Sequence, residues 1–441
     1  MLELEVKKIG INGEGIAYYN KKIVFIDNAL PKEKVKVEIV EETDKFIKAD
    51  LKEIIVKSPF RINPFCEKYD ECGACNLQHV TYNESLNLKR ELIIEALEKY
   101  SGLNPRKFEI KHTIGMSNPY NYRNKLTAPI KDLNGCAWGM FKPNTNHLVI
   151  LHDCKVQYDD LNTTCNDIVK LMDKLGFKPK NKNEGLIKYI VIRQSSYTKE
   201  IQVTLILAET KTDVTPLVEE IKKLKNVSSI YTDINKGESV DIFGSKLKKH
   251  YGKDYITDKL DKFVFNLLPN AFFQLNPIQA VALYNEARKA AKLSLKEKVV
   301  DCYCGVGTIS LWVSNLAKEV IGIENNKESI KSANENALNN KIKNVKFICG
   351  DVLTELDKIN DIDVIIADPP RSGMRDLTFK ILDKQPKRIV YVSCNPSTFA
   401  KDLKILSKKY DVKYIQPVDM FPFTSKVECV CSLSLKKTNV K

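Results

Sequence analysis

Cys394 lies where a nucleophile could act on a ligand. It follows residues 390–393, a mainly apolar run typical of a buried strand, and Asn395 and Pro396 then turn the chain. A thiolate attacks carbon readily near neutral pH, where a serine hydroxyl is not ionised. A single cysteine at a strand end is, however, ordinarily a small buried apolar side chain. The functional interpretation therefore depends on what lies beside this strand end.

Acidic residues end three predicted strands upstream of Cys394. Glu324 ends the second strand, Asp351 the third and Asp368 the fourth. The carboxyl ends of parallel strands meet at one edge of a sheet, and a carboxylate after the second strand can accept both ribose hydroxyls of an adenosine. Asp351 could face the adenine edge, and acids at three strand ends suit a cationic sulfonium cofactor better than a phosphate. The alternative is that one or two of them cap the following helices.

A glycine turn follows the first strand of this series, residues 298–302. Gly305 and Gly307 allow a ligand to approach the backbone before a helix begins at Thr308. A dinucleotide site would have a third glycine at position 310, which is Ser310. The incomplete fingerprint disfavours a nicotinamide cofactor and favours a cofactor without a pyrophosphate.

A second chemical feature is a group of cysteines in the first half of the chain. Cys66, Cys72 and Cys75 lie close together in sequence, and Cys154 follows later. Four soft thiolates suit a [4Fe–4S] cluster or a structural zinc ion, and Cys-x2-Cys spacing is common to both. The spacing Cys-x3-Cys-x2-Cys of radical methylating enzymes is absent. A structural or RNA-positioning cluster that ties the two segments together is expected.

These residues need a scaffold, and the periodicity of the chain predicts one in three parts. Residues 1–57 contain five short β-branched or alternating runs, which predict a small barrel of the oligonucleotide-binding kind. Residues 58–265 begin with a loop-rich linker and an amphipathic helix at 84–100, and are then rich in strands. Residues 266–441 alternate strands and helices, the pattern of a doubly wound parallel sheet. The predicted fold class is therefore multidomain α/β with a Rossmann-like sheet, a central β-rich α+β domain and an N-terminal β-barrel.

The overall composition fits a basic globular protein. The 441 residues carry 70 Lys and Arg against 56 Asp and Glu, a net charge of +14, which suits a polyanion partner or a generally lysine-rich composition. No apolar stretch of about 18 residues is present, so no membrane span is expected. The first residues lack the layout of a signal peptide, and we expect a cytoplasmic protein whose 12 cysteines are not paired in disulfides.

Taken together and in order, these motifs resemble those of the RNA uracil-5-methyltransferases, in particular the iron–sulfur-containing bacterial enzymes that act on 23S ribosomal RNA. The resemblance covers nearly the whole chain and includes an N-terminal TRAM-type barrel. The matching motifs are Cys66-x5-Cys72-Gly73-x-Cys75 with Cys154, Tyr122-Arg123-Asn124-Lys125, Phe273-Gln274-x-Asn276, Asp301-x-Tyr303-Cys304-Gly305-x-Gly307, Asp368-Pro369-Pro370-Arg371 and Ser393-Cys394-Asn395-Pro396.

The resemblance implies a covalent mechanism. Cys394 would add to carbon 6 of uracil, carbon 5 would take a methyl group from S-adenosylmethionine, and Glu428 would then remove the carbon-5 proton. The target would be a uridine in a loop or single strand of ribosomal RNA, flipped out of any stack, and the enzyme would act as a monomer. The resemblance also assigns the cysteines Cys66, Cys72, Cys75 and Cys154 to a [4Fe–4S] cluster, and S-adenosylmethionine contacts to Gln274, Tyr303, Thr308, Glu324, Asp351 and Asp368.

The chain departs from the family just before the expected base. The family usually has Phe-Pro-His-Thr-x-His-x-Glu, whereas Phe423 and Lys426 replace the two histidines here. A proton relay through those histidines cannot apply, and Lys426 could instead meet a phosphate.

Three alternative functions stay open. One is the same chemistry on transfer RNA. Another is methylation of an exocyclic amine, although Arg371 stands where such enzymes need an aromatic residue. The third is a non-enzymatic iron–sulfur RNA-binding protein, which would have no use for Cys394.

Overall fold

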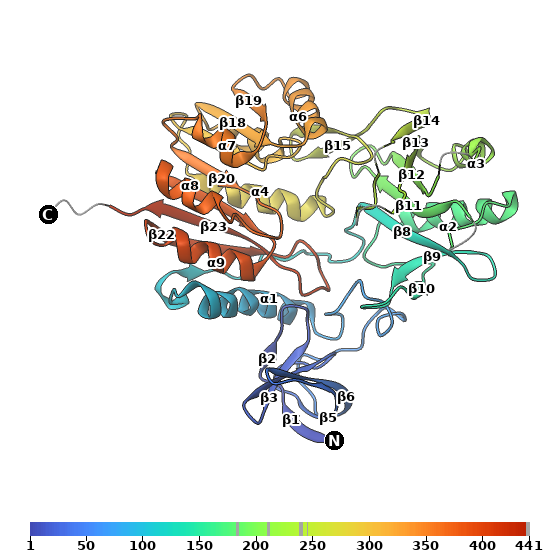
Figure 1. Cartoon of the computed structure of the whole chain (residues 1–441), viewed down its shortest axis with the longest axis horizontal. Helices are drawn as coiled ribbons and strands as arrows, with labels where there is room; N and C mark the ends of the chain where they lie inside the picture. The colour runs from blue at the N-terminus through green and yellow to red at the C-terminus, as the bar shows by residue number, and fades with distance from the viewer. Residues whose placement is uncertain (182–184, 210–211, 238–240, 245, 438–441) are drawn as a thin grey trace.

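A computed structural model describes residues 1–181, 185–209, 212–237, 241–244 and 246–437. The strands form three large sheets and one hairpin. In Figure 1 the N-terminal sheet lies at the bottom, the central sheet at the right, and the C-terminal sheet with its helices at the upper left. The predicted multidomain α/β architecture is confirmed.

The N-terminal sheet has six strands, because the first predicted run is divided in two. The apolar side chains of its alternating strands, such as Val24, Val35 and Ile47, face inward and form a small core. The strand order is β1-β5-β6-β4-β3-β2. The strands are β1 (Leu2–Glu5), β2 (Lys8–Ile9), β3 (Gly15–Tyr19), β4 (Lys22–Ile26), β5 (Lys34–Glu42) and β6 (Phe46–Val56).

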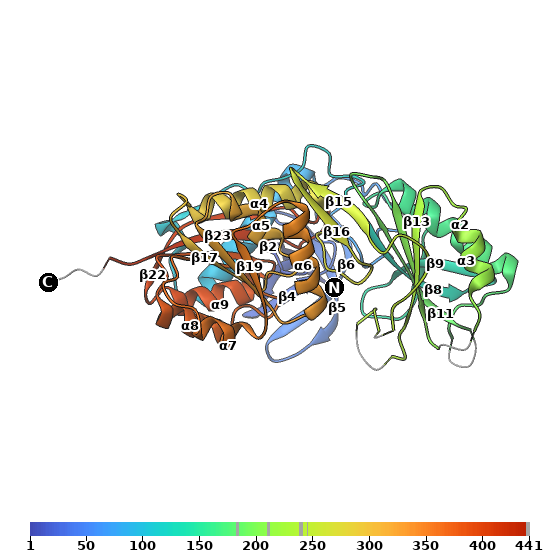
Figure 2. The ribbon, with the colours of Figure 1, turned by 90° about the horizontal axis from the view of Figure 1, so that it is seen from above.

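The central sheet has seven strands in the order β10-β9-β8-β11-β12-β13-β14. Helices α2 (Asp159–Leu175) and α3 (Thr215–Ile221) lie together on one of its faces, as Figure 2 shows, and bury the apolar side chains of that face. Its strands are β8 (Lys125–Asp132), β9 (Cys136–Phe141), β10 (Leu148–Ile150), β11 (Ile187–Gln194), β12 (Ile201–Leu207), β13 (Val227–Ile234) and β14 (Lys248–Gly252). The hairpin of β15 (Ile256–Leu260) and β16 (Phe263–Leu267) leads into the C-terminal part.

The C-terminal sheet has eight strands in the order β19-β18-β17-β20-β21-β23-β22-β7, and β23 runs antiparallel to its neighbours. Its strands are β17 (Lys298–Cys302), β18 (Glu319–Glu324), β19 (Val345–Cys349), β20 (Val364–Ala367), β21 (Arg388–Ser393), β22 (Tyr410–Val418) and β23 (Glu428–Leu435). Helices α4 (Pro277–Ala291), α5 (Thr308–Ser314) and α6 (Lys327–Asn339) cover one face. Helices α7 (Val352–Asp357), α8 (Leu377–Lys384) and α9 (Pro396–Leu406) cover the other. The sheet is thus doubly wound, as the alternation of strand and helix predicts.

The helix predicted at 84–100 belongs in space to the C-terminal sheet. It forms α1 (Tyr82–Ala96), followed by the π-helical turn η1 (Leu97–Ser101). Ile93, Ala96 and Leu97 join the core beneath α9, whereas Leu88 and Leu92 pack with Ile9 and Leu30 of the N-terminal part. The 3-10 turn η2 (Pro105–Lys107) then leads to β7 (Glu109–Ile110), which pairs with the edge strand β22. A segment far upstream in sequence therefore completes one side of the C-terminal sheet (Figure 1).

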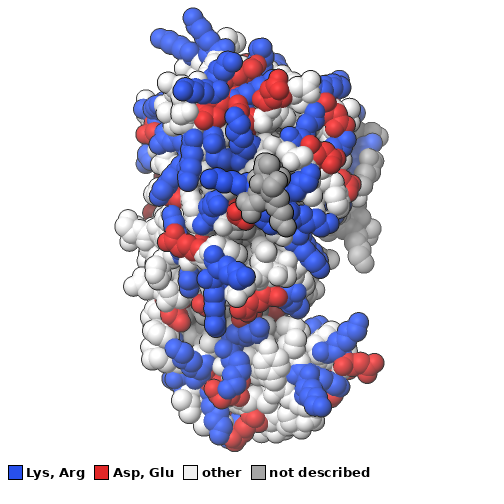
Figure 3. Space-filling model, turned by 90° about the vertical axis from the view of Figure 1, so that its left-hand side faces the viewer, with Lys and Arg blue, Asp and Glu red and all other residues white. Residues whose placement is uncertain are grey.

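None of the helices formed by the described residues is both long and apolar enough to cross a membrane. Lys and Arg side chains are spread over the whole face shown in Figure 3, with Asp and Glu between them. The positive charge is therefore distributed rather than gathered in one patch on this face.

Candidate functional site

The carboxyl ends of the parallel strands meet at one edge of the C-terminal sheet. The last residue of β17, Cys302, pairs with Ile323 of β18 on one side and with Ala367 of β20 on the other, and Ala367 in turn pairs with Tyr391 of β21. The residues that follow these strands consequently share one edge. This is where ligands bind in doubly wound sheets.

The turn after β17 leaves room for a ligand. Tyr303, Gly305 and Gly307 all have φ in the left-handed region, at 65°, 54° and 83°. A side chain added at Gly305 would meet open space, whereas one at Gly307 would lie 2.7 Å from the ring of Phe347. Gly307 is thus needed for packing, and Gly305 borders the space in which a cofactor could lie.

Two of the predicted cofactor carboxylates are already engaged with the backbone. Glu324 accepts hydrogen bonds from the amides of Gly305 (3.3 Å) and Asn326 (2.9 Å), which fixes it against the glycine turn. Asp351 is the N-cap of α7, and its Oδ1 accepts from the amides of Leu353 (3.0 Å) and Thr354 (3.1 Å). The capping alternative therefore applies to Asp351, whose other oxygen stays exposed.

Asp301 and Asp368 are a pair of acids deeper in the site. Asp301 is fully buried at the end of β17, where Ser310 donates to its Oδ2 (2.6 Å). Its Oδ1 is buried and has no hydrogen-bond partner among the described residues. Burial raises the pKa of both carboxyls to about 7, and Asp301 adds to the shift at Asp368. A cationic ligand beside these carboxyls would lower their pKa values and favour the charged forms.

Gln274 and Thr308, both predicted to contact the cofactor, come together around Tyr284. The Tyr284 hydroxyl on α4 interacts with both side chains, and its pKa is raised by burial and then by Asp368 and Glu428. Gln274 is held in place because the Asn124 side chain donates to its carbonyl (3.3 Å). The segment before α4 thus contributes a wall of the site.

Cys394 and Glu428 face one another across adjacent strands. Ser393 of β21 pairs with Cys429 of the antiparallel strand β23. Cys394, which follows Ser393, therefore lies beside Glu428, which precedes Cys429. Burial raises the pKa of Cys394 to about 11, with Glu428 and Asp368 adding to the shift and Arg371 opposing it. Cys394 is nevertheless only partly buried, so its sulfur is not sealed in the core.

Glu428 has the properties of a general base. Only 6% of its surface is exposed. Burial raises the pKa of Glu428 to about 8, Asp368 adds to the shift and Arg371 opposes it. A carboxyl with such a pKa can accept a proton from carbon and release it near neutral pH. The pairing of a thiol with this carboxyl suits addition to a ring followed by proton removal.

Three cations lie near enough to this pair to influence one another or Cys394: Lys426, Arg371 and Arg123. Partial burial lowers the pKa of Lys426, and Arg371 and Arg123 lower it further, whereas Cys394 opposes the shift. Lys426 comes from the loop between β22 and β23, Arg371 from the turn after β20 and Arg123 from the loop before β8. They can attract an anionic ligand and stabilise a thiolate at Cys394.

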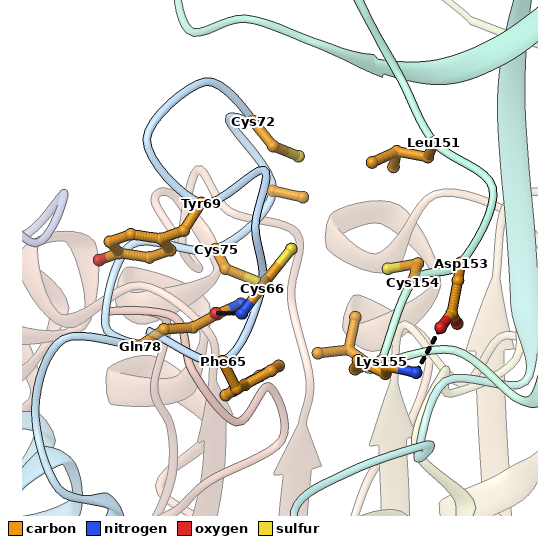
Figure 4. A pocket seen from close by; sticks show the side chains of 12 residues that line it. Phe65, Cys66, Tyr69, Cys72, Cys75, Gln78, Leu151, Asp153, Cys154 and Lys155 are labelled. Atoms are coloured by element: carbon orange, nitrogen blue, oxygen red, sulfur yellow. Dashed lines mark hydrogen bonds and ion pairs between the residues drawn. The ribbon is translucent and has the colours of Figure 1, made fainter. Parts of the chain in front are cut away.

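The four clustered cysteines line one recess. Figure 4 shows Cys66, Cys72 and Cys75 on one loop, and Cys154 on a second segment across the recess. The recess also has apolar walls from Phe65, Leu151 and Val156.

The cysteines of this recess are partly buried. Burial raises the pKa of Cys75 to about 12 and that of Cys154 to about 11. Among the described residues, however, no three His, Cys, Asp or Glu side chains are close enough together to hold one metal ion. The thiols are thus brought to one place without forming a ready site for a single ion.

The structure brings the predicted catalytic and cofactor residues to one edge of the sheet, with Asp351 at its exposed rim, whereas the four predicted cysteines line a separate recess. The sequence analysis gave no role in the site to Asp301, Tyr284 or Arg371. Asp301 and Arg371 could have been found from the sequence, because each lies in a motif that matches the family. Tyr284 could not, because its role depends on how α4 packs against the sheet.

The chain matches two family models. Residues 81–437 match the model described as tRNA (Uracil-5-)-methyltransferase, and residues 1–52 match the TRAM domain. A Bacillus anthracis protein named an uncharacterized RNA methyltransferase is 42% identical over 442 residues, which cover 98% of this chain and 96% of that protein. A protein of the same description from Halalkalibacterium halodurans is 42% identical over 443 residues, which cover 98% of this chain and 95% of that one.

One solved structure is similar over the whole length. It is the Pyrococcus abyssi tRNA (uracil-54, C5)-methyltransferase in complex with S-adenosyl-L-homocysteine. It has 27% sequence identity and a TM-score of 0.79, and the alignment covers 98% of this chain and 100% of that chain.

Proposed function

Because the chain belongs to the tRNA (uracil-5-)-methyltransferase family and carries an N-terminal TRAM domain, we propose that it methylates carbon 5 of a uridine in 23S ribosomal RNA. The observation that carries this proposal is the pairing of Cys394 with Glu428 at the ligand edge of the sheet. A thiol and a basic carboxyl on neighbouring strands, both within reach of one ring, are what carbon-5 chemistry requires, because carbon 5 of uracil is too weak a nucleophile on its own.

The reaction uses the two residues in sequence. The Cys394 thiolate forms a bond to carbon 6, and the electrons of the 5,6 double bond move into an enolate with charge on carbon 5. S-adenosylmethionine, when bound, supplies a methyl group that carbon 5 can attack. Glu428 then takes the carbon-5 proton, the 5,6 double bond re-forms, and the thiolate leaves. Arg371 and Lys426 favour the anionic states of the thiol and the ring.

The residues at the edge fit the methyl donor. Open space at Gly305, the unpartnered Oδ1 of Asp301 and the carboxylate of Asp368 together suit a ligand that carries a positive charge and hydrogen-bond donors. Glu324 lies where a ribose would be bound. Further support is the similar Pyrococcus abyssi enzyme, whose structure contains S-adenosyl-L-homocysteine.

We further propose that Cys66, Cys72, Cys75 and Cys154 hold a [4Fe–4S] cluster. Four thiols of one chain line a shared apolar recess, which suits soft thiolate ligation. A zinc ion needs all of its ligands on one atom, whereas the ligands of a cluster bind separate irons and can lie further apart. When bound, the cluster would tie the cysteine loop to the segment around Cys154.

Ribosomal RNA is the proposed substrate because Cys66, Cys72, Cys75 and Cys154 are the residues in which the chain resembles the iron–sulfur-containing enzymes that act on 23S ribosomal RNA. A transfer RNA is the second candidate, since the similar solved enzyme is named for uracil 54 of tRNA. In both cases the uridine must lie in a loop or be flipped out to reach Cys394. A single chain supplies every residue of the proposed site, and we expect a monomer to be active.

A mechanism-based trap tests the reaction. The protein is incubated with S-adenosylmethionine and 5-fluorouridine-containing transcripts of either 23S ribosomal RNA or tRNA. Fluorine cannot be removed as a proton, so a covalent protein–RNA adduct should accumulate with the true substrate and be absent in Cys394→Ala. Cys349→Ala, which changes an exposed cysteine at the end of β19, should trap normally. Failure of the wild type to trap either RNA would contradict the proposed function.

A further inference from the structure

The loop that delivers Glu428 to the site is held from several directions. This base loop, residues 419–427, joins β22 to β23, and Glu428 is the first residue after it. At its start Lys89 and Asp419 form an ion pair in which both side chains are fully buried. Lys89 also donates to the Phe421 carbonyl (3.0 Å). The first half of the base loop is therefore anchored to α1.

The second half of the base loop is anchored by one residue of the cysteine loop. The side chain of Asn76 accepts from the amide of Ser425 (2.7 Å) and donates to the Ser425 hydroxyl (3.1 Å). The amides of Asn76 (3.1 Å) and Leu77 (3.0 Å) both donate to the carbonyl of Phe423. Asn76 directly follows Cys75, so the loop that carries the clustered cysteines is bonded to the loop that ends at Glu428.

The N-terminal sheet joins the same contact through the turn between β2 and β3. The Ser425 hydroxyl donates to the carbonyl of Ile11 (2.9 Å), and the Asn76 amide group donates to the carbonyl of Asn12. Gly13 has a φ of 94°, and a side chain added there would lie 2.6 Å from the amide nitrogen of Asn76. The turn is thus shaped around Asn76.

The base loop needs these restraints because it contains a strained residue. Phe423 has a φ of 64°, in the left-handed region that an aromatic residue rarely adopts. Its ring lies 4.7 Å from that of Phe65 and 5.1 Å from that of Tyr120, which helps to hold it there. Strain of this kind persists only where the surroundings fix the conformation.

We propose that Asn76 is a positioning residue for Glu428. Its side chain joins the N-terminal turn, the cysteine loop and the base loop, and it fixes the distance from Glu428 to the carbon-5 proton. This inference rests on the proposed function, because it takes Glu428 as the base. It assigns Asn76 to the proton-removal step and not to RNA binding or methyl transfer.

Asn76→Ala tests the assignment. The protein is given RNA labelled with tritium at carbon 5 of uridine, and methyl incorporation is followed in parallel with tritium release. Tritium release should slow by about 10- to 100-fold, as for a catalytic group displaced by about 1 Å. The first round of methyl transfer should keep its rate, the Kd for RNA should stay unchanged, and a methylated covalent adduct should accumulate. Ser425→Ala, which removes fewer bonds, should show the same pattern more weakly and serves if Asn76→Ala does not fold.

Asn87→Ala is the matched control, because Asn87 is exposed on α1 and, among the residues that the structure describes, its side chain bonds only to Glu84. It should leave both rates unchanged. The inference is overturned if the folded Asn76 and Ser425 variants release tritium at the wild-type rate, or if methyl transfer and tritium release fall equally. Trapping of the wild type by 5-fluorouridine RNA separates the two proposals. If the wild type is not trapped, the proposed function fails. If it is trapped, the measurements on the variants test only the role of Asn76.

Discussion

Replacement of Glu428 by Gln gives the sharpest test of the site. Glutamine has the same shape and can occupy the same buried position, but it cannot accept the carbon-5 proton. A positioned general base contributes about 10²- to 10⁴-fold to a rate. This corresponds to about 2.7–5.5 kcal/mol in the barrier to proton removal. Steps before proton removal do not need the carboxylate and should be affected much less.

The pH dependence follows from the environment of Glu428. Burial and Asp368 raise the pKa of Glu428 to about 8, against the opposing effect of Arg371. Only the deprotonated carboxylate can act as a base, so activity should rise as the pH rises. At pH 7 only about one-tenth of the free enzyme has Glu428 ionised. The rate of proton removal in the wild type should therefore be half-maximal near pH 8 and level off above it. A bound cationic methyl donor should shift this profile to lower pH.

The assay compares tritium release from carbon 5 with methyl incorporation in a single turnover. Glu428→Gln should incorporate methyl, release tritium slowly and without the wild-type pH dependence, and accumulate a covalent adduct with ordinary uridine RNA. Glu91→Gln, at an exposed position on α1, should behave as the wild type. If Glu428→Gln released tritium as fast as the wild type, another group would have to be the base.

Three further predictions concern the anchors of the site. Lys89→Met leaves the Asp419 carboxylate buried without its cation, so the free energy of unfolding measured in urea should fall by about 3–5 kcal/mol; a fall below about 1 kcal/mol would show that the pair is unimportant. Asp351→Ser keeps an N-cap for α7 but removes the exposed carboxylate, so the Kd for S-adenosylmethionine in calorimetry should rise about tenfold; an unchanged Kd would leave Asp351 as a cap alone. Cys154→Ser should lose most of the iron found after anaerobic purification, whereas Cys136→Ser should retain it, and equal iron in both would contradict the proposed cluster.

The short-range features of the catalytic part were predictable from the sequence. The strand expected at 298–302 has those bounds, and the strand ends expected at Glu324, Asp351, Asp368 and Ser393 lie within two residues of the observed ends. They were predictable because buried strands read as apolar runs between helical patterns. Once those strands are parallel, the residues after them must share an edge. The approach of Glu324, Asp368 and Cys394 to one ligand-binding edge therefore followed from the pattern alone.

Other features of the site and the fold could not be predicted from the local sequence pattern. The sequence left open whether the acids after strands bind a ligand or cap a helix, and only the hydrogen bonds to Oδ1 show that Asp351 caps α7. The helix at 84–100 was predicted, but not its place on the C-terminal sheet. An amphipathic helix shows which of its faces is buried, but not the surface against which that face packs.

The sequence by itself determined the order of the chemical groups along the chain and the type of sheet that carries the site. The tertiary structure decided how the base is held, because the bonds that hold it join residues very far apart. Lys89 and Asp419 are 330 positions apart, and Asn76 and Ser425 are 349 apart. Hydrophobic periodicity extends over a few turns or strands, whereas polar contacts of this range depend on how whole modules pack. The base loop is therefore fixed by the meeting of three parts of the chain, which no local pattern can specify.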